Sequence, residues 1–423
     1  MKNLFLIAVF ALVSHVTVSA QALTPIEELG KNIFFDRLSA GPPRQACASC
    51  HHPSAGWTGG IAGINIHGAV YPGAEPRAFG NRKPPSSAYA TFSPNFYFDS
   101  DTGEFIGGNL WDGRATGWLR GSPTADQALG PFAADVEQNI SLQKVCMKIQ
   151  ASKYAMLFEQ VWGPGSLDCT DSGYLDTGDR IALSIAAYEA SAEVIPFSSR
   201  FDDYWRVCLN TGNDAEACGK AEGDKAVLDP DNLLTEQEFE GLVQFGEYCS
   251  ACHVSHEPGP DGLPPVFSSH EFDNIGVPRN PENPVYEYDP GFVDLGLGGF
   301  LDTADEWAHL ARLNDGKMKI PTVRNVAAGL GEGFTRSYMH NGVFKSLEQV
   351  VHFYNTRDVP EAGWPPPEVE ANVNRELFEG VPLGDLQLPA EDEAAIVAFL
   401  ATLTDRVAPG KPIGVIAPRA VPR

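Results

Sequence analysis

Apolar residues recur at helical spacing behind a capping residue in three segments of the chain. Two of these segments, 24–35 and 235–245, begin with a threonine, continue with acidic residues in the first turn, and then carry apolar side chains at helical intervals. The third segment, 389–404, places apolar residues from Ile396 to Leu403 on one face. The pattern predicts three amphipathic helices, and the first two form a loose internal repeat.

The remainder of the chain favours loops. Its 423 residues include 42 glycines and 33 prolines, and further helices are expected over 142–161 and 180–193. Short apolar runs suit no more than a minor hairpin. A polar stretch containing Pro230 precedes the second capping threonine and predicts a domain boundary. We therefore expect a mainly α protein with long loops and little β structure, divided into residues 21–228 and 229–423.

Two Cys-x-x-Cys-His pentads carry the most specific chemistry in the chain. The first contains Cys47, Cys50 and His51, and the second contains Cys249, Cys252 and His253. In such a pentad both thiols bond to haem vinyl groups, and the histidine is an axial ligand of the iron. A zinc site would need a second Cys pair close by, and a redox disulfide would not need the histidine. The pentads therefore predict two covalently bound haem c groups in two cytochrome-c-like domains.

The first twenty residues are typical of a secretory signal peptide. Lys2 supplies the positive charge, residues 4–13 are apolar, and Val18-Ser19-Ala20 suits a cleavage site. The apolar run is too short for a comfortable membrane span, and no later run is longer. We expect an exported, periplasmic protein without a membrane-spanning helix.

Four cysteines remain outside the pentads: Cys146, Cys169, Cys208 and Cys218. An even number in an oxidising compartment predicts two disulfide bonds. The simplest pairing joins Cys146 to Cys169 and Cys208 to Cys218, and the two other connectivities remain open.

The net charge of −25 argues against binding to nucleic acid or to an anionic membrane. The same charge favours a basic or neutral protein partner.

Several further motifs point to one family. They are the segment 107–114 with its Trp-Asp-Gly-Arg sequence, the Gln-Ala-Leu-Gly-Pro segment 127–131 followed by Glu137, Pro-Thr-Val-Arg-Asn at 321–325, and Tyr-Met-His-Asn-Gly at 338–342. Together with the pentads, they resemble the bacterial dihaem cytochrome c peroxidase superfamily, specifically its MauG-like branch. The resemblance extends from about residue 23 to residue 404.

The resemblance implies roles for four residues. Trp111 would lie between the two haems and couple them, while Gln127, Pro131 and Glu137 would line the pocket of the N-terminal haem where hydrogen peroxide reacts. Splitting the O–O bond requires a proton to move from one oxygen to the other, which a carboxylate such as Glu137 can accomplish. Six extra residues separate Trp111 from Gln127 relative to the family spacing, around Trp118.

The second axial ligand of the C-terminal haem distinguishes the branches of this family. Simple peroxidases carry a methionine 14 residues after the histidine of the Tyr-x-His segment, and MauG-like proteins carry a tyrosine. Here the position after His340 is Tyr354. A phenolate stabilises oxidised iron, whereas a thioether stabilises ferrous iron. Met318 and His352 are the rival ligands.

Two other positions match the family pattern less well. His67 could be a distal ligand of the N-terminal haem, but its surroundings do not resemble a peroxidase distal loop, so we expect a five-coordinate haem. The resemblance implies a calcium ion between the haems, held by Asn81 and by the carbonyls of Thr335 and Ser337. Lys83 stands where the family has an asparagine; its ammonium could replace the ion, Asn81 could substitute, or the ion could be lost.

The first functional hypothesis is a periplasmic MauG-like dihaem enzyme. It would use hydrogen peroxide and a high-valent dihaem state to oxidise Trp or Tyr residues of an exported partner protein by long-range electron transfer. The related MbnH-type enzymes act on a copper-associated partner. Glu247 replaces the family's surface tryptophan, so Tyr248, Trp307 or Trp364 would have to relay electrons.

Two alternatives complete the set of hypotheses. A cytochrome c peroxidase would reduce hydrogen peroxide with electrons from a small cytochrome or cupredoxin. A dihaem electron carrier would perform no peroxide chemistry.

Overall fold

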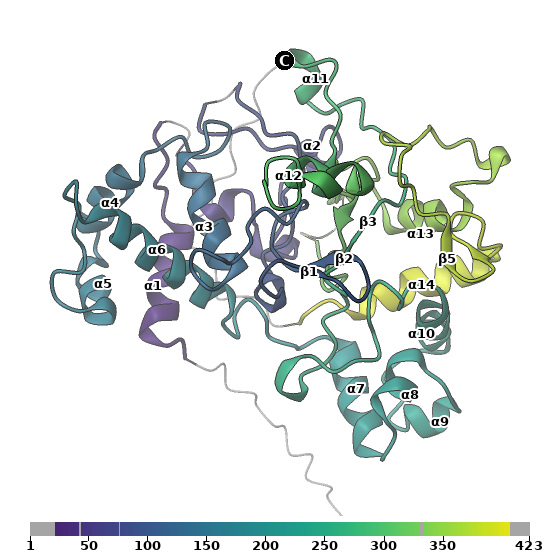
Figure 1. The fold of residues 1–423 in the computed structure, drawn as a ribbon. Helices are drawn as coiled ribbons and strands as arrows, with labels where there is room; N and C mark the ends of the chain where they lie inside the picture. The colour runs from purple at the N-terminus through teal and green to yellow at the C-terminus, as the bar shows by residue number, and fades with distance from the viewer. Residues whose placement is uncertain (1–21, 42–43, 76, 330, 332, 407–423) are drawn as a thin grey trace, which may run out of the picture.

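The computed structural model describes residues 22–406, apart from 42–43, 76, 330 and 332. The predicted signal peptide therefore lies outside the described residues. The described chain is mainly helical with three small two-stranded sheets, which confirms the predicted fold class. Figure 1 shows the N-terminal helices on the left and the C-terminal helices on the right. In the described part of the chain, none of the helices is long and apolar enough to cross a membrane.

Two long helices cross at the centre of the N-terminal half. α1 (Pro25–Phe35) begins at the capping box of Thr24 and Glu27, as predicted, and packs against α6 (Tyr174–Glu189). Gly30 lies at the crossing, where a Cβ atom would be 1.8 Å from the carbonyl oxygen of Ser184. Glycine therefore permits the close approach of the two helices.

The C-terminal half repeats this arrangement. α10 (Glu236–Tyr248) begins at the capping box of Thr235 and Glu238 and packs against α14 (Ala390–Thr402). A Cβ atom on Gly241 would be 1.9 Å from the carbonyl oxygen of Ala395. Gly30 and Gly241 stand at the same position relative to their capping threonines, so the internal repeat extends to the helix crossing.

The other α-helices are α2 (Ala62–Asn65), α3 (Pro123–Ala133), α4 (Leu142–Gln150), α5 (Ala155–Trp162), α7 (Arg200–Asn210), α8 (Ala215–Lys220), α9 (Lys225–Leu228), α11 (Val285–Tyr288), α12 (Gly296–Leu301) and α13 (Leu347–Thr356). Short 3₁₀ turns occupy Cys47–Ser49, Pro53–Ala55, Ala90–Phe92, Pro260–Gly262, Ala308–Asn314 and Pro360–Ala362. The helix predicted over 142–161 is divided into α4 and α5. The helix predicted over 180–193 starts earlier and is α6.

All three sheets are antiparallel pairs of two or three residues per strand. β1 (Tyr97–Asp99) pairs with β2 (Glu104–Ile106), β3 (Phe272–Asp273) with β4 (Met318–Lys319), and β5 (Glu376–Phe378) with β6 (Val381–Pro382). Only the first and last pairs are hairpins, whereas β3 and β4 are distant in sequence.

The buried side chains form two large apolar clusters. The first contains residues from Leu29 to Phe197 together with Val266, and the second begins at Phe201 in α7 and ends at Leu403. Residues 201–228, which the sequence prediction assigned to the N-terminal domain, thus pack with the C-terminal cluster. One reason is the ion pair between Asp202 of α7 and Arg324, whose side chains are both fully buried.

Both predicted disulfide bonds are confirmed. Cys146 in α4 is bonded to Cys169, and Cys208 in α7 is bonded to Cys218 in α8. The four cysteines of the two pentads take part in neither disulfide bond.

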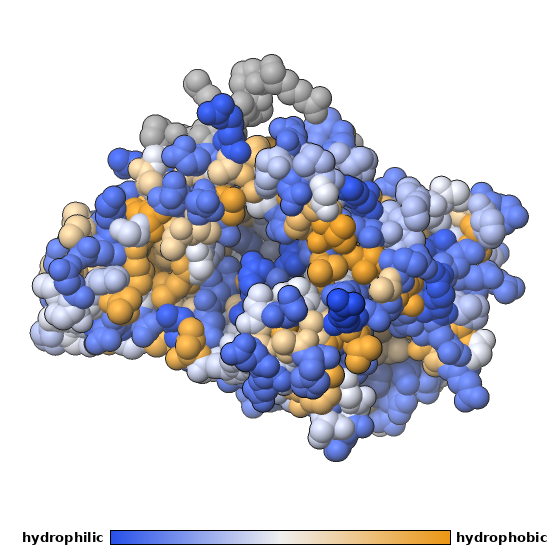
Figure 2. Space-filling view, turned by 45° about the horizontal axis from the view of Figure 1, so that its top comes forward, coloured by the Kyte–Doolittle hydropathy of each residue, from blue (hydrophilic) through white to orange (hydrophobic). Residues whose placement is uncertain are grey.

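The surface drawn in Figure 2 is mostly hydrophilic and is hollowed near its middle, with hydrophobic side chains gathered beside the hollow.

Candidate functional site

Each pentad lies in the wall of its own cavity. The N-terminal cavity has a volume of about 310 Å³ and is lined by Cys47, Cys50 and His51. The C-terminal cavity has a volume of about 200 Å³ and is lined by Cys249, Cys252 and His253. The structure therefore brings both thiols and the imidazole of each pentad to one concave surface.

The two pentad histidines are oriented in the same way. The Nδ1 atom of His51 lies 3.2 Å from the carbonyl oxygen of Trp57, and that of His253 lies 3.3 Å from the carbonyl oxygen of Phe267. Both accepting residues have a left-handed backbone, with φ angles of 61° and 59°. A proton on Nδ1 that is donated to this carbonyl leaves Nε2 free to bind a metal. Burial also lowers the pKa of His51 to about 4, so its imidazole is neutral, as a ligand must be.

Buried cations provide an independent test of whether haem fits. Lys83, Lys319 and Arg336 line the N-terminal cavity, and in the described part of the chain none of them has a carboxylate within ion-pair distance. Burial lowers the pKa of both lysines to about 7, and the Nε atom of Arg336 has no acceptor. Such groups are costly to bury without an anion. Haem propionates would supply these anions, so the residues present fit the group.

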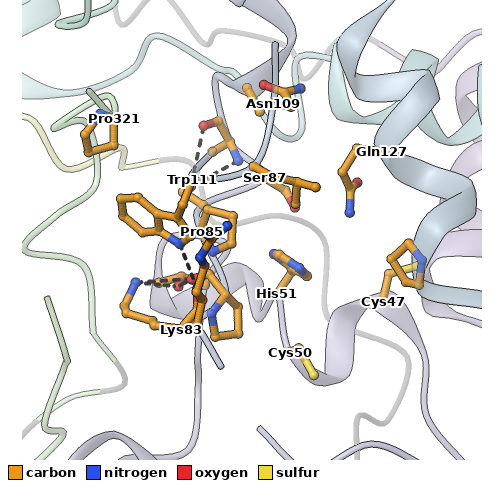
Figure 3. A pocket seen from close by; sticks show the side chains of 18 of the residues that line it. Cys47, Cys50, His51, Lys83, Pro85, Ser87, Asn109, Trp111, Gln127 and Pro321 are labelled. Atoms are coloured by element: carbon orange, nitrogen blue, oxygen red, sulfur yellow. Dashed lines mark hydrogen bonds between the residues drawn. The ribbon is translucent and has the colours of Figure 1, made fainter. Parts of the chain in front are cut away.

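Trp111 lies between the two cavities and lines both of them. Its Nε1–H group donates a hydrogen bond of 2.9 Å to the carbonyl oxygen of Lys83, as Figure 3 shows. Its ring centroid lies 6.4 Å from that of His340, which belongs to the C-terminal cavity. A rigid indole in this position is suited to electronic coupling between groups in the two cavities.

The loop that carries Trp111 depends on unusual backbone geometry. Gly107, Gly108, Leu110 and Gly113 all have positive φ angles, and a Cβ atom on Gly108 would lie 2.4 Å from the carbonyl oxygen of Gly113. Glycine is the residue that permits such a tight loop. The segment 107–114 therefore has a structural reason for its three glycines.

An arginine secures the same loop to the C-terminal half. Arg82 donates to the carboxylates of Asp112 and Asp294, at 2.6 Å in each case. Burial alone would raise the pKa of Asp294, but the hydrogen bonds from Arg82 outweigh it and lower the pKa to about 2. The sequence did not indicate this link, because its partners are far apart along the chain.

The predicted peroxide pocket is assembled on α3 and the loop after it. Gln127 and Pro131 are four residues apart, so they lie on the same face of α3, and both line the N-terminal cavity with Glu137. Figure 3 shows Gln127 across the cavity from Trp111. Glu137 remains accessible from the cavity, yet the surrounding protein raises the pKa of its carboxyl, and Arg114 opposes this shift only partly. A carboxyl with a raised pKa is suited to proton transfer near neutral pH.

Tyr354 lies on α13 and lines the C-terminal cavity. Burial raises the pKa of its phenol well above the ordinary value, so the ionised form would require a nearby positive charge such as a metal ion. Met318 and His340 line the same cavity. His352, in contrast, is exposed and paired with Glu393 at 3.0 Å, outside the residues that line the cavity.

His67 is also outside the cavity that it was considered to serve. Its side chain is exposed and lies 3.3 Å from Glu282. The N-terminal cavity is not lined by this residue.

The residues considered for a calcium ion do not form an acidic cluster. The carbonyl of Thr335 accepts a hydrogen bond from Asn65, and the carbonyl of Asn81 accepts one from Asn283. Ser337 lines the N-terminal cavity together with the cations Lys83 and Arg336. Among the described residues, no group of three acidic, histidine or cysteine side chains could hold a metal ion.

One further residue of the N-terminal cavity was not predicted. Glu189, at the end of α6, is 4 % exposed, and burial raises its pKa to about 8. Its position at the end of an amphipathic helix gave no signal in the sequence, because the neighbouring residues suit an ordinary helix end.

Comparisons with known proteins agree with this geometry. Residues 24–208 match the family described as di-haem cytochrome c peroxidase. The methylamine utilization protein MauG of Paracoccus denitrificans is 30% identical over 436 residues, which cover 96% of each chain. The cytochrome c551 peroxidase of Nitrosomonas europaea is 25% identical over 395 residues, which cover 91% of this chain and 82% of that one. The crystal structure of the diheme peroxidase BthA from Burkholderia thailandensis superimposes with a TM-score of 0.69 at 27% identity and covers 93% of each chain.

Proposed function

The chain belongs to the di-haem cytochrome c peroxidase and MauG family of haem oxidoreductases, and from this premise we propose that it is a periplasmic enzyme that uses hydrogen peroxide to oxidise Trp or Tyr side chains of an exported partner protein. When bound, the two haems supply the redox chemistry, because they accept two oxidising equivalents from peroxide and release them one electron at a time. The observation that carries the proposal is the position of Trp111 in the walls of both cavities.

The pentad residues hold the cofactors in this proposal. The thiols of Cys47 and Cys50, and those of Cys249 and Cys252, would form the covalent attachments, and the adjacent histidines would bind the iron. Lys83, Lys319 and Arg336, which line the N-terminal cavity, would pair with haem propionates. A calcium ion at Asn81, Thr335 and Ser337 is disfavoured by two of these cations, so we propose that the Lys83 ammonium takes its place.

The residues of the N-terminal cavity activate peroxide. Gln127 orients the peroxide by a hydrogen bond, and Pro131 fills the adjacent face of α3 without adding a competing donor. Glu137 takes a proton from one peroxide oxygen and gives it to the other, which leaves as water. Burial raises the pKa of Glu137, which makes its carboxyl a better proton acceptor than an ordinary carboxylate.

Tyr354 decides what happens to the oxidising equivalents. As a ligand of the C-terminal haem, Tyr354 would supply an oxygen donor that favours oxidised iron, and Trp111 would then couple the two haems so that they share the oxidising equivalents. The oxidised side chain of the partner then need not enter either cavity.

A second candidate function is peroxide removal with electrons from a small cytochrome or cupredoxin. The observation that favours it is the presence of Met318 in the wall of the C-terminal cavity. A thioether ligand would stabilise reduced iron and make that haem an electron donor.

The reaction of the fully ferric holoenzyme with hydrogen peroxide distinguishes the two functions. The proposal predicts that the ferric enzyme reacts without prior reduction and then oxidises Trp or Tyr residues of an exported partner, detected by mass spectrometry of that partner. If peroxide reacts only after one haem is reduced, and turnover with a small redox protein is fast, the second candidate function is correct.

A further inference from the structure

Trp364 is a surface residue connected to the C-terminal cavity by aromatic contacts. Its ring centroid lies 5.3 Å from that of Phe353, at an interplanar angle of 88°, and Phe353 lies 6.4 Å from Tyr354. Phe353 is buried, whereas Trp364 is partly exposed. A continuous aromatic path therefore leads from the cavity wall, through Phe353 of helix α13, to the solvent.

The indole of Trp364 is held in one orientation. Its Nε1–H group donates a hydrogen bond of 3.0 Å to the hydroxyl of Thr356, and its ring contacts Phe344 at 5.5 Å. The three prolines 365–367 follow it and restrict the backbone. The ring of His352, paired with the carboxylate of Glu393, lies 5.9 Å away. The hydrogen bond, the ring contacts and the prolines therefore hold the indole in one orientation.

We propose that Trp364 is the surface residue through which the partner protein delivers electrons to the C-terminal haem domain, and that the partner docks against Trp364 and the adjacent prolines. This inference rests on the proposed function. It assigns a route and a contact surface that the family resemblance left open, because Glu247 occupies the position at which the family has a surface tryptophan.

The two rival aromatic residues are less suited to the role. Trp307 lacks an aromatic path to a cavity, and Tyr248 lacks an acceptor for its phenolic proton within the described residues. The described ring contacts of Trp307 are with Phe96, Phe105 and Trp118, none of which lines either cavity. Tyr248 lines the C-terminal cavity, but within the described residues its phenol has no hydrogen-bond acceptor for the proton that tyrosine oxidation releases.

The electron balance of the route is simple. Trp364 loses one electron to the oxidised haem pair, with Phe353 as a bridge that is not itself oxidised, and becomes an indole radical cation. A Trp or Tyr of the partner then returns one electron to Trp364 and is oxidised in turn. Two such transfers, with two protons from solvent, complete the reduction of one hydrogen peroxide to two waters.

The surface around Trp364 indicates the chemistry of the partner. Pro365 and Pro366 are exposed next to the indole and offer a rigid apolar platform. Glu361 is exposed and has no ion-pair partner among the described residues, and the whole chain carries a net charge of −25. A partner that presents an oxidisable aromatic residue next to lysines or arginines fits this surface.

Spin trapping tests the route in the holoenzyme. Peroxide is added to the ferric holoenzyme in the presence of a nitroso spin trap, and the trapped residue is located by mass spectrometry. We expect an adduct on Trp364 in the wild type, and we expect the oxidised haem spectrum of Trp364→Phe to form normally but decay several-fold more slowly. The matched control Trp307→Phe should behave as the wild type.

Short peptides test the contact surface. A Lys-Trp-Lys peptide should be oxidised about tenfold faster than a Glu-Trp-Glu peptide at low ionic strength, and this preference should be lost at high salt and in Trp364→Phe. An adduct on Tyr248 or Trp307 together with unchanged decay in Trp364→Phe would overturn the proposed route. An enzyme whose haems do not react with peroxide would instead overturn the proposed function and the route together.

Discussion

Replacing Arg82 with methionine should destabilise the contact between the two halves of the molecule. The substitution leaves the carboxylate of Asp294 buried, with 4% of its side chain exposed, and removes one of two cations from Asp112. Breaking a buried ion pair by removing one partner costs about 3–5 kcal/mol. For a chain of this size, the expected loss in Tm is roughly 5 °C.

Arg114 provides a matched control for this prediction. Arg114 also pairs with Asp112, but 53% of its side chain is exposed. Because exposed pairs contribute little, Arg114→Met should cost less than about 1 kcal/mol. The double variant Arg82→Met with Asp294→Asn should regain part of the loss, since it no longer buries an unpaired charge.

The same ion pair makes a pH-dependent contribution. The pKa of Asp294 is lowered to about 2 in the folded chain, from an ordinary value of 3.8. Its stabilising contribution, about 2 kcal/mol, is therefore fully present above pH 4 and is lost as the pH falls towards 2. Thermal unfolding of the holoenzyme, followed by circular dichroism and by the haem absorbance, measures these effects. Equal losses in Arg82→Met and Arg114→Met would refute the reasoning.

Three further predictions concern proton transfer, helix packing and metal content. Glu137→Gln should slow the reaction with peroxide by about 10²–10⁴-fold at unchanged haem content, as measured by stopped-flow absorbance. The ionisation of Glu137, whose pKa is raised above 4.5, should also vanish from the pH–rate profile. An unchanged rate would show that the residue has no role. Gly241→Ala should cost about 1–3 kcal/mol in thermal unfolding because its Cβ atom would lie 1.9 Å from a backbone oxygen, whereas Gly63→Ala, which meets nothing within 4 Å, should be nearly neutral. Lys83 and Arg336 provide positive charge beside Ser337, so we expect no calcium ion at this site. Dialysis against a chelator should therefore leave the reactivity with peroxide unchanged. Elemental analysis that found one calcium per chain, together with loss of reactivity on its removal, would contradict this.

The parts of the fold that depend on local chemistry could be predicted from the sequence. Thr24 and Thr235 each precede an acidic residue at the third helical position, and both helices begin where these capping boxes predict. The even cysteine count outside the pentads likewise predicted two disulfide bonds, and the pairing of nearest neighbours is confirmed.

The parts that depend on distant residues could not be predicted. Asp202 and Arg324 form a fully buried pair that contributes to α7 packing with the C-terminal cluster, and no local pattern connects them. The link from Arg82 to Asp294 and the cations Lys319 and Arg336 in the N-terminal cavity are similar cases. Each has an ordinary sequence environment, and its significance appears only when the chain folds around the cavities.

The candidate site contains residues that the sequence predicted and residues whose role depends on the folded chain. The pentads and the motif residues Trp111, Gln127 and Glu137 were identified by their sequence context, and the structure places all of them at the cavities. The rigid indole of Trp364 was only one of three alternatives in the sequence. Its ring contacts with Phe353 distinguish it from Trp307 and Tyr248.

The nature of the second axial ligand of the C-terminal haem tests the central proposal most directly. Electron paramagnetic resonance and magnetic circular dichroism of the ferric holoenzyme, compared with Tyr354→Phe and Met318→Leu, should show oxygen and nitrogen ligation that only Tyr354→Phe alters. A wild-type spectrum with sulfur ligation that disappears in Met318→Leu would contradict the account.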